Sequence, residues 1–133
     1  MDRRTERKNS FCLIFSLGFD HQYDLQDFLD NYIEYQNIEL KEKNKKFIWS
    51  LYNGTHEKLE NIDKIISKNL KEWSLNRLNK VDLAILRLAV FEIFFFETPE
   101  KVAINEALEL AKEYSSDESP SFINGVLAGL VKK

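Results

Sequence analysis

Apolar residues recur at helical spacing along almost the whole chain. In residues 20–40 they follow an i, i+3, i+4, i+7, i+8 pattern, which places one apolar face on a helix: Leu25, Phe28, Leu29, Tyr32 and Ile33. The same stretch carries six acidic residues and no Lys or Arg. We therefore predict an amphipathic helix whose outer face is acidic and solvated.

Two further helical patterns flank this one. Residues 3–18 place an apolar stripe at helical spacing, with Gly18 as the stop signal. Residues 42–70 form a long helical pattern with Asn53-Gly54 in its middle. This pair either ends one helix, with Thr55 capping the next, or lies inside a single helix.

The last third of the chain predicts three helices. Residues 80–96 are apolar nearly all round, so this helix must be covered on several sides, and Asn79 stands at its N-cap position. Thr98-Pro99 and Ser119-Pro120 each supply a capping residue followed by Pro at the first helical position. The whole pattern predicts an all-α fold, a compact bundle of about seven helices.

Composition agrees with one helical domain. The chain has 133 residues, of which 44% are apolar and 13% aromatic, enough for a real core. Only four Gly and two Pro argue against a turn-rich β-sandwich or barrel. The longest apolar run, residues 83–96, is shorter than the roughly 20 residues that span a bilayer, so we expect no membrane association and a cytoplasmic protein.

Catalytic motifs are missing from the sequence. It has no phosphate-binding Gly loop, paired cysteines or nucleophile elbow, so we expect no enzyme, cofactor or metal site. His21 and His56 lack partners at ligand spacing, and we predict both to be exposed. The single cysteine, Cys12, is predicted to be a small core residue.

Two charges interrupt the apolar helix of residues 80–96. Arg87 and Glu92 need partners if they are buried, because an unpaired buried charge is costly. We expect Arg87 to reach a carboxylate, with Glu106 as the candidate, in preference to a direct contact with a nucleic acid. Gly125 and Gly129 are expected to allow close packing between helices.

The N-terminus holds the strongest candidate for a binding site. The chain has a net charge of −3, so no global basic field indicates a nucleic-acid partner. Four cations nevertheless cluster at the start of the first helix: Arg3, Arg4, Arg7 and Lys8. Cations oppose the macrodipole at this end of a helix, which favours a role outside the fold, such as binding phosphates.

Three segments of the last third carry a family resemblance. Val81-Asp82-Leu83-Ala84-Ile85-Leu86-Arg87, Lys101-Val102-Ala103-Ile104-Asn105-Glu106-Ala107 and Phe122-Ile123-Asn124-Gly125-Val126-Leu127 stand in an order and spacing that resemble the transcription antitermination factor NusB family. The resemblance implies two packed helical subdomains, about 1–72 and 73–133, and favours a single long helix over 42–70. It also implies a non-enzymatic role: binding single-stranded boxA RNA of ribosomal RNA leaders with NusE, a small-subunit ribosomal protein, in an antitermination complex on RNA polymerase.

The resemblance also implies site residues. The RNA-binding set that it suggests, with the N-terminal cations, is Arg3, Arg4, Arg7, Lys8, Phe15, Glu118, Ser119 and Phe122, and the partner-binding residue is Asp82. Phe15 is equally well interpreted as a core residue or as a platform for a base. The chain departs from the family pattern at Glu6, Cys12, Ser115, Ser116 and Ser121. Glu6 and Ser121 are expected to make the RNA surface less positive.

Three alternatives stay open at this point. Some RNA cytosine methyltransferases carry a domain of this type, and the chain would then be a recognition fragment of such an enzyme. It could instead be a helical protein-interaction module that does not bind RNA. Self-association through the RNA-facing side is a further state that the resemblance allows.

Overall fold

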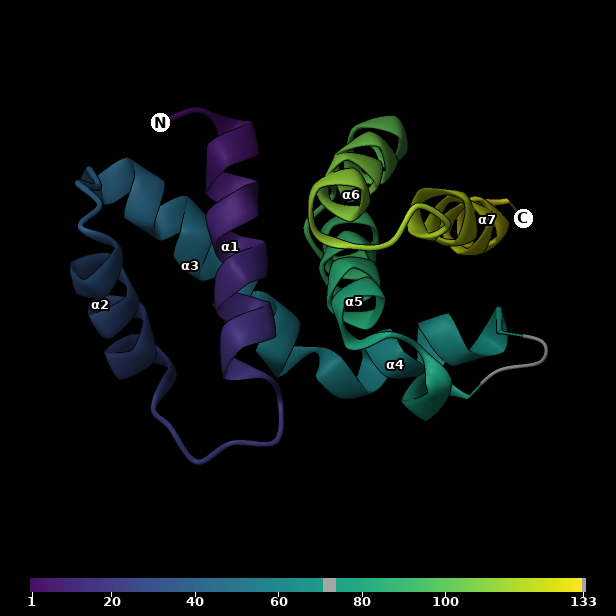
Figure 1. Ribbon diagram of the computed structural model, residues 1–133, viewed down its shortest axis with the longest axis horizontal. Helices are drawn as coiled ribbons and strands as arrows, with labels where there is room; N and C mark the ends of the chain where they lie inside the picture. The colour runs from purple at the N-terminus through teal and green to yellow at the C-terminus, as the bar shows by residue number, and fades with distance from the viewer. Residues whose placement is uncertain (71–73, 133) are drawn as a thin grey trace.

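The computed structural model describes residues 1–70 and 74–132 of the chain, and its regular elements are helices joined by loops (Figure 1). Within these residues there are seven α-helices, one short 3₁₀-helix and no strand, which confirms the predicted all-α fold. The elements are α1 (Arg3–Leu17), α2 (Leu25–Gln36), α3 (Glu42–Glu57), α4 (Leu59–Lys68), η1 (Leu75–Arg77), α5 (Lys80–Phe95), α6 (Glu100–Tyr114) and α7 (Ser119–Val131).

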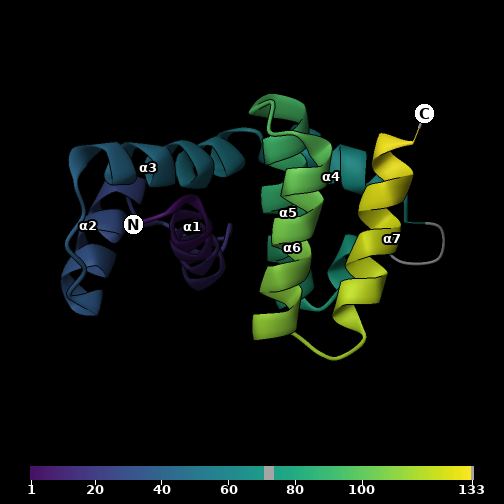
Figure 2. The ribbon, with the colours of Figure 1, turned by 90° about the horizontal axis from the view of Figure 1, so that it is seen from above.

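Helix α5 lies at the centre of the arrangement. It packs against α1, α3, α4, α6 and α7, while α2 contacts α1 at the edge of the bundle. Figures 1 and 2 show α1, α2 and α3 gathered on one side and α5, α6 and α7 on the other, with α4 continuing from α3 toward the second group. The predicted boundary at 72/73 falls outside the described residues, so the division into two subdomains stays a prediction.

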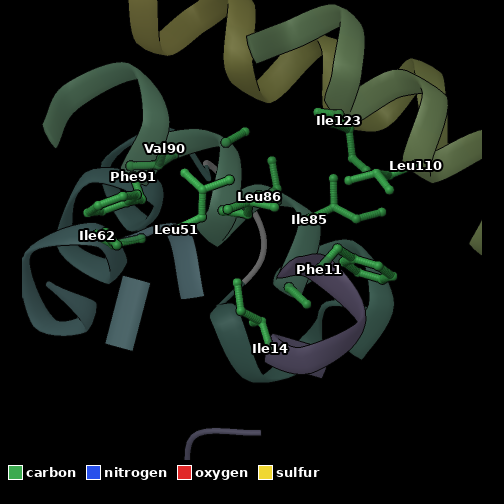
Figure 3. Close-up of a cluster of buried hydrophobic side chains, with 14 of the residues drawn as sticks. Phe11, Ile14, Leu51, Ile62, Ile85, Leu86, Val90, Phe91, Leu110 and Ile123 are labelled. Carbon is green, nitrogen blue, oxygen red and sulfur yellow. The ribbon is translucent and has the colours of Figure 1, made fainter. Parts of the chain in front are cut away.

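The core is built around the apolar sides of α5 (Figure 3). Ile85, Leu86 and Val90 are fully buried, and Ile14, Leu51, Ile62 and Ile123 meet them from four other helices. Burying each such side chain contributes about 1.5–3 kcal/mol. This confirms the prediction that the nearly all-apolar segment 80–96 is covered on several sides.

The pattern over 42–70 forms two helices, and the prediction of one long helix was wrong. The break falls at Lys58, not at Asn53-Gly54. Gly54 lies inside α3, where a Cβ would collide with the ring of Phe91, so the glycine allows α3 to approach α5 closely. Thr55 does not cap a helix, because its hydroxyl donates to the Leu51 carbonyl within α3.

Of the predicted N-cap residues of α5 and α6, one is confirmed and one is not. The Asn79 side chain accepts hydrogen bonds from the N–H groups of Val81 and Asp82, at 2.7 and 3.3 Å, which confirms it as the cap of α5. Thr98 does not cap α6, since Pro99 holds that position and the Thr98 hydroxyl donates to Glu92 at 2.9 Å.

The start of α7 also differs from the prediction. Glu118 occupies the cap position, and Ser119 is the first residue of the helix. The Ser119 hydroxyl donates to Asp82 at 3.0 Å instead of to the backbone of its own helix. A side-chain acceptor on α5 therefore took the place of the expected capping bond.

The first helix ends where it was predicted to end, whereas the second is shorter than predicted. Gly18 terminates α1 with a φ of 73°, a conformation that favours glycine. Helix α2 begins after Asp24, whose side chain accepts the N–H of Asp27, and ends at Asn37 in the left-handed region. It is thus shorter than the predicted span of 20–40.

The two glycines of α7 behave differently. Gly129 lies against the side chain of Asn69, so close packing is confirmed there. Gly125 is exposed, and a Cβ placed on it would meet nothing within 4 Å. The prediction that Gly125 serves helix packing was wrong, because that face of α7 points away from the bundle.

Candidate functional site

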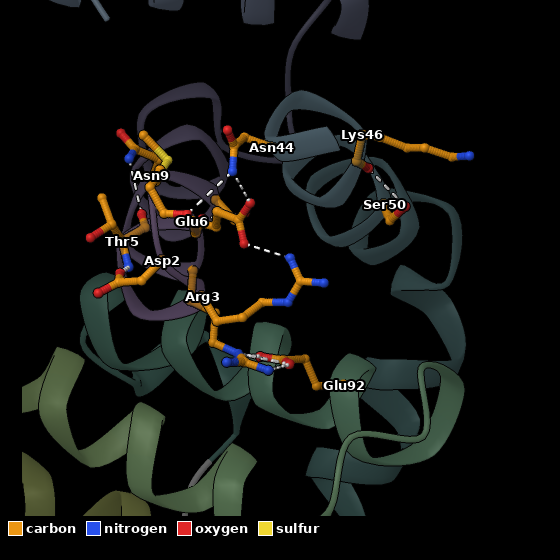
Figure 4. Close-up of polar contacts among 12 residues, drawn as sticks. Asp2, Arg3, Thr5, Glu6, Asn9, Asn44, Lys46, Ser50 and Glu92 are labelled. Carbon is orange, nitrogen blue, oxygen red and sulfur yellow. Dashed lines mark hydrogen bonds and ion pairs between the residues drawn. The ribbon is translucent and has the colours of Figure 1, made fainter. Parts of the chain in front are cut away.

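In the first turn of α1, Arg3 contacts two groups of its own protein, and Figure 4 shows one of these contacts, the pair with Glu6. Its Nη1 donates to Glu6 at 2.7 Å, and its Cζ lies 3.8 Å from the centre of the Phe47 ring. Glu6 itself is buried and also accepts a hydrogen bond from Asn44. Glu6 therefore neutralises Arg3 from a buried position, which agrees with the expectation that it makes this surface less positive.

Arg4 and Lys8 lie one turn apart on α1 and face α6. Nη2 of Arg4 is 2.9 Å from Glu106, and Nζ of Lys8 is 2.7 Å from Glu113. These hydrogen bonds to carboxylates raise the pKa of the Arg4 guanidinium and of the Lys8 ammonium. Both cations remain substantially exposed, beside a groove of about 360 Å³ between the two helices.

Arg7 also lines this groove, but its side chain is largely buried. Its side chain is 10% exposed, and its guanidinium pairs with Glu92 of α5 at 2.9–3.0 Å. The prediction of Arg7 as a phosphate contact does not fit this burial. The four cations also have a role within the fold, because each of them has a carboxylate partner.

Phe15 stands further along the same helix and is exposed. Its side chain is 44% accessible, which resolves its placement in favour of the surface over the core. The ring stacks on Phe11 with a centroid distance of 6.0 Å, so its outer face is open while its inner face is supported. Phe15 lines a hollow of about 510 Å³ together with Phe19 and Lys80.

The floor of this hollow holds Arg87, whose partner differs from the prediction. Its guanidinium forms two hydrogen bonds with Asp63 of α4, at 2.9 and 3.0 Å, and lies 4.6 Å above the Phe19 ring. Glu106, the expected partner, binds Arg4 instead. Arg87 therefore ties α5 to α4.

His56 packs against Phe19, which lines this hollow. Its Nδ1 lies 3.0 Å from the Tyr52 carbonyl, its Nε2 lies 3.1 Å from the Gly18 carbonyl, and its ring stacks on Phe19. The prediction of an exposed histidine was wrong, because the loop after α1 folds over the ring. Burial lowers the pKa of His56, and the two carbonyl contacts oppose that effect.

The start of α7 forms a third hollow, of about 330 Å³. Glu118 is exposed and Phe122 half-buried at its rim, whereas Ser119 is buried. The Asp82 carboxylate, 6% exposed, accepts hydrogen bonds from Ser119 and, at 2.6 Å, from Ser115. Asp82 thereby holds the connection between α6 and α7 against the first turn of α5.

Neighbouring hollows share a lining helix. Helix α1 lines the first and the second, and the first turns of α5 line the second and the third. The sequence-predicted residues thus spread along an extended surface and do not converge on one pocket. Lys80 and Lys112 also line these hollows, and nothing in the sequence pattern separates them from other surface lysines.

Residues 1–70 and 74–132 hold neither a metal-binding group nor a membrane-spanning helix. No group of three or more His, Cys, Asp or Glu is placed to hold a metal ion. None of the described helices is long and apolar enough to cross a bilayer. Cys12 is half-buried, with its Sγ 3.7 Å from the Tyr114 hydroxyl.

Fold and surface together define a small all-α bundle with an extended charged and aromatic face. The sequence profile of the NusB family matches residues 4–132. The transcription antitermination protein NusB of Clostridium novyi is 42% identical over 133 residues, covering 99% of each chain. That of Finegoldia magna is also 42% identical and covers 100% of this chain and 96% of its own. The chain belongs to the NusB family, which confirms the resemblance.

Solved structures agree with this assignment. NusB of T. maritima superposes with a TM-score of 0.88 at 36% identity, over 100% of this chain and 92% of its own. A NusB solved as antitermination factors NusB and NusE in complex with dsRNA gives a TM-score of 0.85 at 27% identity, over 98% of this chain and 96% of its own.

Proposed function

We propose that this protein is a non-enzymatic transcription antitermination factor that binds boxA-type single-stranded RNA of ribosomal RNA leaders together with NusE. The observation that carries the proposal is the exposed line of Arg4, Lys8 and Phe15 along α1. Relatives that match over nearly their full length are named antitermination proteins, which supports this role over that of a methyltransferase's recognition domain.

The proposed contacts follow from the chemistry of these side chains. Arg3, Arg4 and Lys8 would bind phosphates, the arginines through their forked guanidinium groups. The open face of Phe15 offers a stacking platform for a base, a contact that tolerates any base. Glu118 and Phe122, at the rim of the third hollow, form the second part of the proposed RNA surface. Arg7 and Ser119 act in this proposal by supporting the exposed residues.

NusE is the proposed protein partner. A relative has been solved with NusE and dsRNA, which supports a joint complex. The net charge of −3 gives this chain little long-range attraction for RNA, so a partner that adds contacts would raise affinity. Asp82 stays a predicted partner-binding residue, reached through the hollow that it lines. We further propose that the complex acts on RNA polymerase in the cytoplasm.

Fluorescence anisotropy of a labelled boxA-type RNA tests the proposal. The protein is titrated alone and with equimolar NusE, against a scrambled RNA of equal length. Tighter, sequence-dependent binding in the mixture is expected. NusE binding without any RNA binding would instead support a protein-interaction module, and a concentration-dependent dimer that loses RNA would support self-association through this face.

Matched variants locate the surface. Arg4→Ala and Lys8→Ala should each lower affinity and reduce the slope of log K against log salt by up to about 0.7. Lys64→Ala, an exposed lysine on α4, serves as the control of equal charge change. If all three variants bind alike, the assignment of the α1 surface is wrong.

A further inference from the structure

The cations of α1 are covered by a row of acids on α6. Glu106, Glu109 and Glu113 recur at intervals of three and four residues and therefore share one helical face. Arg4 and Lys8, four residues apart, share the opposing face of α1. Glu106 pairs with Arg4 and Glu113 with Lys8, so the two helices meet through alternating charges.

This groove contains no surplus of positive charge. Arg7 is neutralised by Glu92 beneath it. The other cations that line the groove are Arg4, Lys8 and Lys112, and its three carboxylates match them in number. A phosphate approaching this part of α1 meets a locally neutral surface.

The pairs are accessible, and this allows exchange. The Arg4 side chain is 64% exposed and that of Lys8 45%, while Glu106 is 15% and Glu113 49% exposed. Ion pairs at such positions are weak, because water screens them and two long side chains must be held in one geometry. An RNA phosphate can therefore displace these carboxylates.

We propose that Glu106 and Glu113 act as built-in counterions that compete with RNA phosphates for Arg4 and Lys8 and so set the protein's affinity for RNA. This inference rests on the proposed RNA-binding function and names a regulation of the same surface. The two carboxylates occupy the cations in the free protein and give them up when RNA binds.

The competition should lower the affinity for RNA by a modest factor that does not depend on the RNA sequence. Breaking each exposed pair lowers affinity by about two- to fivefold, as expected for weak surface ion pairs. The loss is the same for every RNA sequence, because phosphates carry no sequence information. The carboxylates thus suppress binding through charge alone and leave discrimination to base contacts and to the protein partner.

Salt dependence provides a second signature. Salt weakens the contacts of Arg4 and Lys8 with phosphates, and it also weakens their pairs with Glu106 and Glu113. The second effect partly offsets the first in the natural protein. Without the carboxylates only the first remains, so affinity should fall more steeply with salt.

The test compares two double variants of equal net charge. Glu106→Gln/Glu113→Gln removes the competing charges with little change of shape. Glu34→Gln/Glu39→Gln makes the same charge change at exposed positions on and just after α2, on the other side of α1 from α6 (Figure 1). Thermal unfolding of both variants checks that the bundle is intact.

At low ionic strength the α6 variant should bind boxA-type RNA, with NusE present, about fivefold to twentyfold more tightly than the natural protein. The α2 variant should differ by less than about twofold, since the carboxylates paired with Arg4 and Lys8 are Glu106 and Glu113, which this variant leaves unchanged. Equal affinities for the two variants would overturn the inference.

A mutant cycle in which Arg4 and Lys8 are also removed tests whether Glu106 and Glu113 act through these two cations. In an Arg4→Ala/Lys8→Ala background, neutralising Glu106 and Glu113 should no longer raise affinity, because nothing remains for them to cover. An equally large gain in this background would show that the acids repel RNA generally and would overturn the proposed pairing.

Failure of the inference can be told apart from failure of the proposed function. If the natural protein with NusE does not bind RNA, the function is wrong, and retention on a heparin column then tests the counterions alone. The α6 variant should elute at higher salt than the α2 variant. Elution at the same salt would overturn the inference whatever the RNA result.

Discussion

Arg7 of α1 and Glu92 of α5 form a buried ion pair across 85 positions of sequence. Nε of Arg7 donates to both carboxylate oxygens at 3.0 Å, and the Thr98 hydroxyl donates to one of them at 2.9 Å. The pair fixes the helix that carries the exposed cations to the central helix of the bundle. It therefore positions the proposed RNA surface without belonging to it.

Removing one partner of this pair should destabilise the protein. Arg7→Ala leaves the Glu92 carboxylate buried without its cation, and the expected loss is about 3–5 kcal/mol of the free energy of unfolding. Urea denaturation measures it. Arg4→Ala, at an exposed pair on the same helix, should change the unfolding midpoint little.

The double variant Arg7→Met/Glu92→Leu provides the control for this prediction. It replaces both charges by apolar groups and should be considerably more stable than Arg7→Ala, because no charge stays buried alone. If the single and the double variants unfold at the same urea concentration, packing and not charge accounts for the role of Arg7.

The helices themselves were largely predictable, because their signals are local. The apolar stripe of α2, the all-round apolar pattern of α5 and the Asn79 cap each involve neighbours within one or two turns. The break at Lys58 had no such signal, since neither Gly nor Pro stands there.

Charge partners were not predictable from the sequence. Arg87 was expected to meet Glu106, yet it binds Asp63, and Glu106 binds Arg4. Periodicity tells which residues share a face of one helix but not which helix that face meets. The candidate cations could thus be located in the sequence, whereas their burial and their neutralisation depend on tertiary packing.

Gly54 marks a close approach between α3 and α5. A Cβ at this position would collide with the Phe91 ring, so Gly54→Ala should lower stability by about 1–3 kcal/mol. Gly125→Ala on the exposed side of α7 is the matched control and should raise stability by about 0.5–1 kcal/mol. Thermal unfolding compares the two.

A compensating change isolates the cause. Phe91→Leu shortens the side chain that faces Gly54, so adding it to Gly54→Ala should recover part of the lost stability. Strictly additive losses in the double variant would argue that the collision with Phe91 is not what Gly54 avoids.

His56 should make stability depend on pH between about 5 and 7. Burial lowers the pKa of its imidazole below the usual value of 6.5, so in this range the unfolded chain binds the proton more readily than the folded one. Stability is therefore fully present above about pH 6.5 and falls as the pH drops below it. Arg87 and His21, which face the ring, oppose its protonation further.

Melting temperatures measured across this range check the prediction. The natural protein should lose stability from pH 7 to pH 5, and His56→Gln should show a flatter dependence over the same interval. An identical dependence in both proteins would assign the acid sensitivity to other groups.

Phe15 is the position where stability and binding should separate most clearly. Its ring is 44% exposed and rests on Phe11, so its outer face is free for a base. Stacking on an aromatic side chain contributes about 1–3 kcal/mol per base, and Phe15→Ala should accordingly weaken RNA binding roughly 5- to 150-fold while the protein stays folded.

Tyr35→Ala, at an 87% exposed aromatic on α2, should leave RNA binding unchanged. Phe15→Trp keeps a stacking surface and should restore most of the affinity, whereas equal binding by Phe15→Ala and Tyr35→Ala would remove Phe15 from the RNA surface.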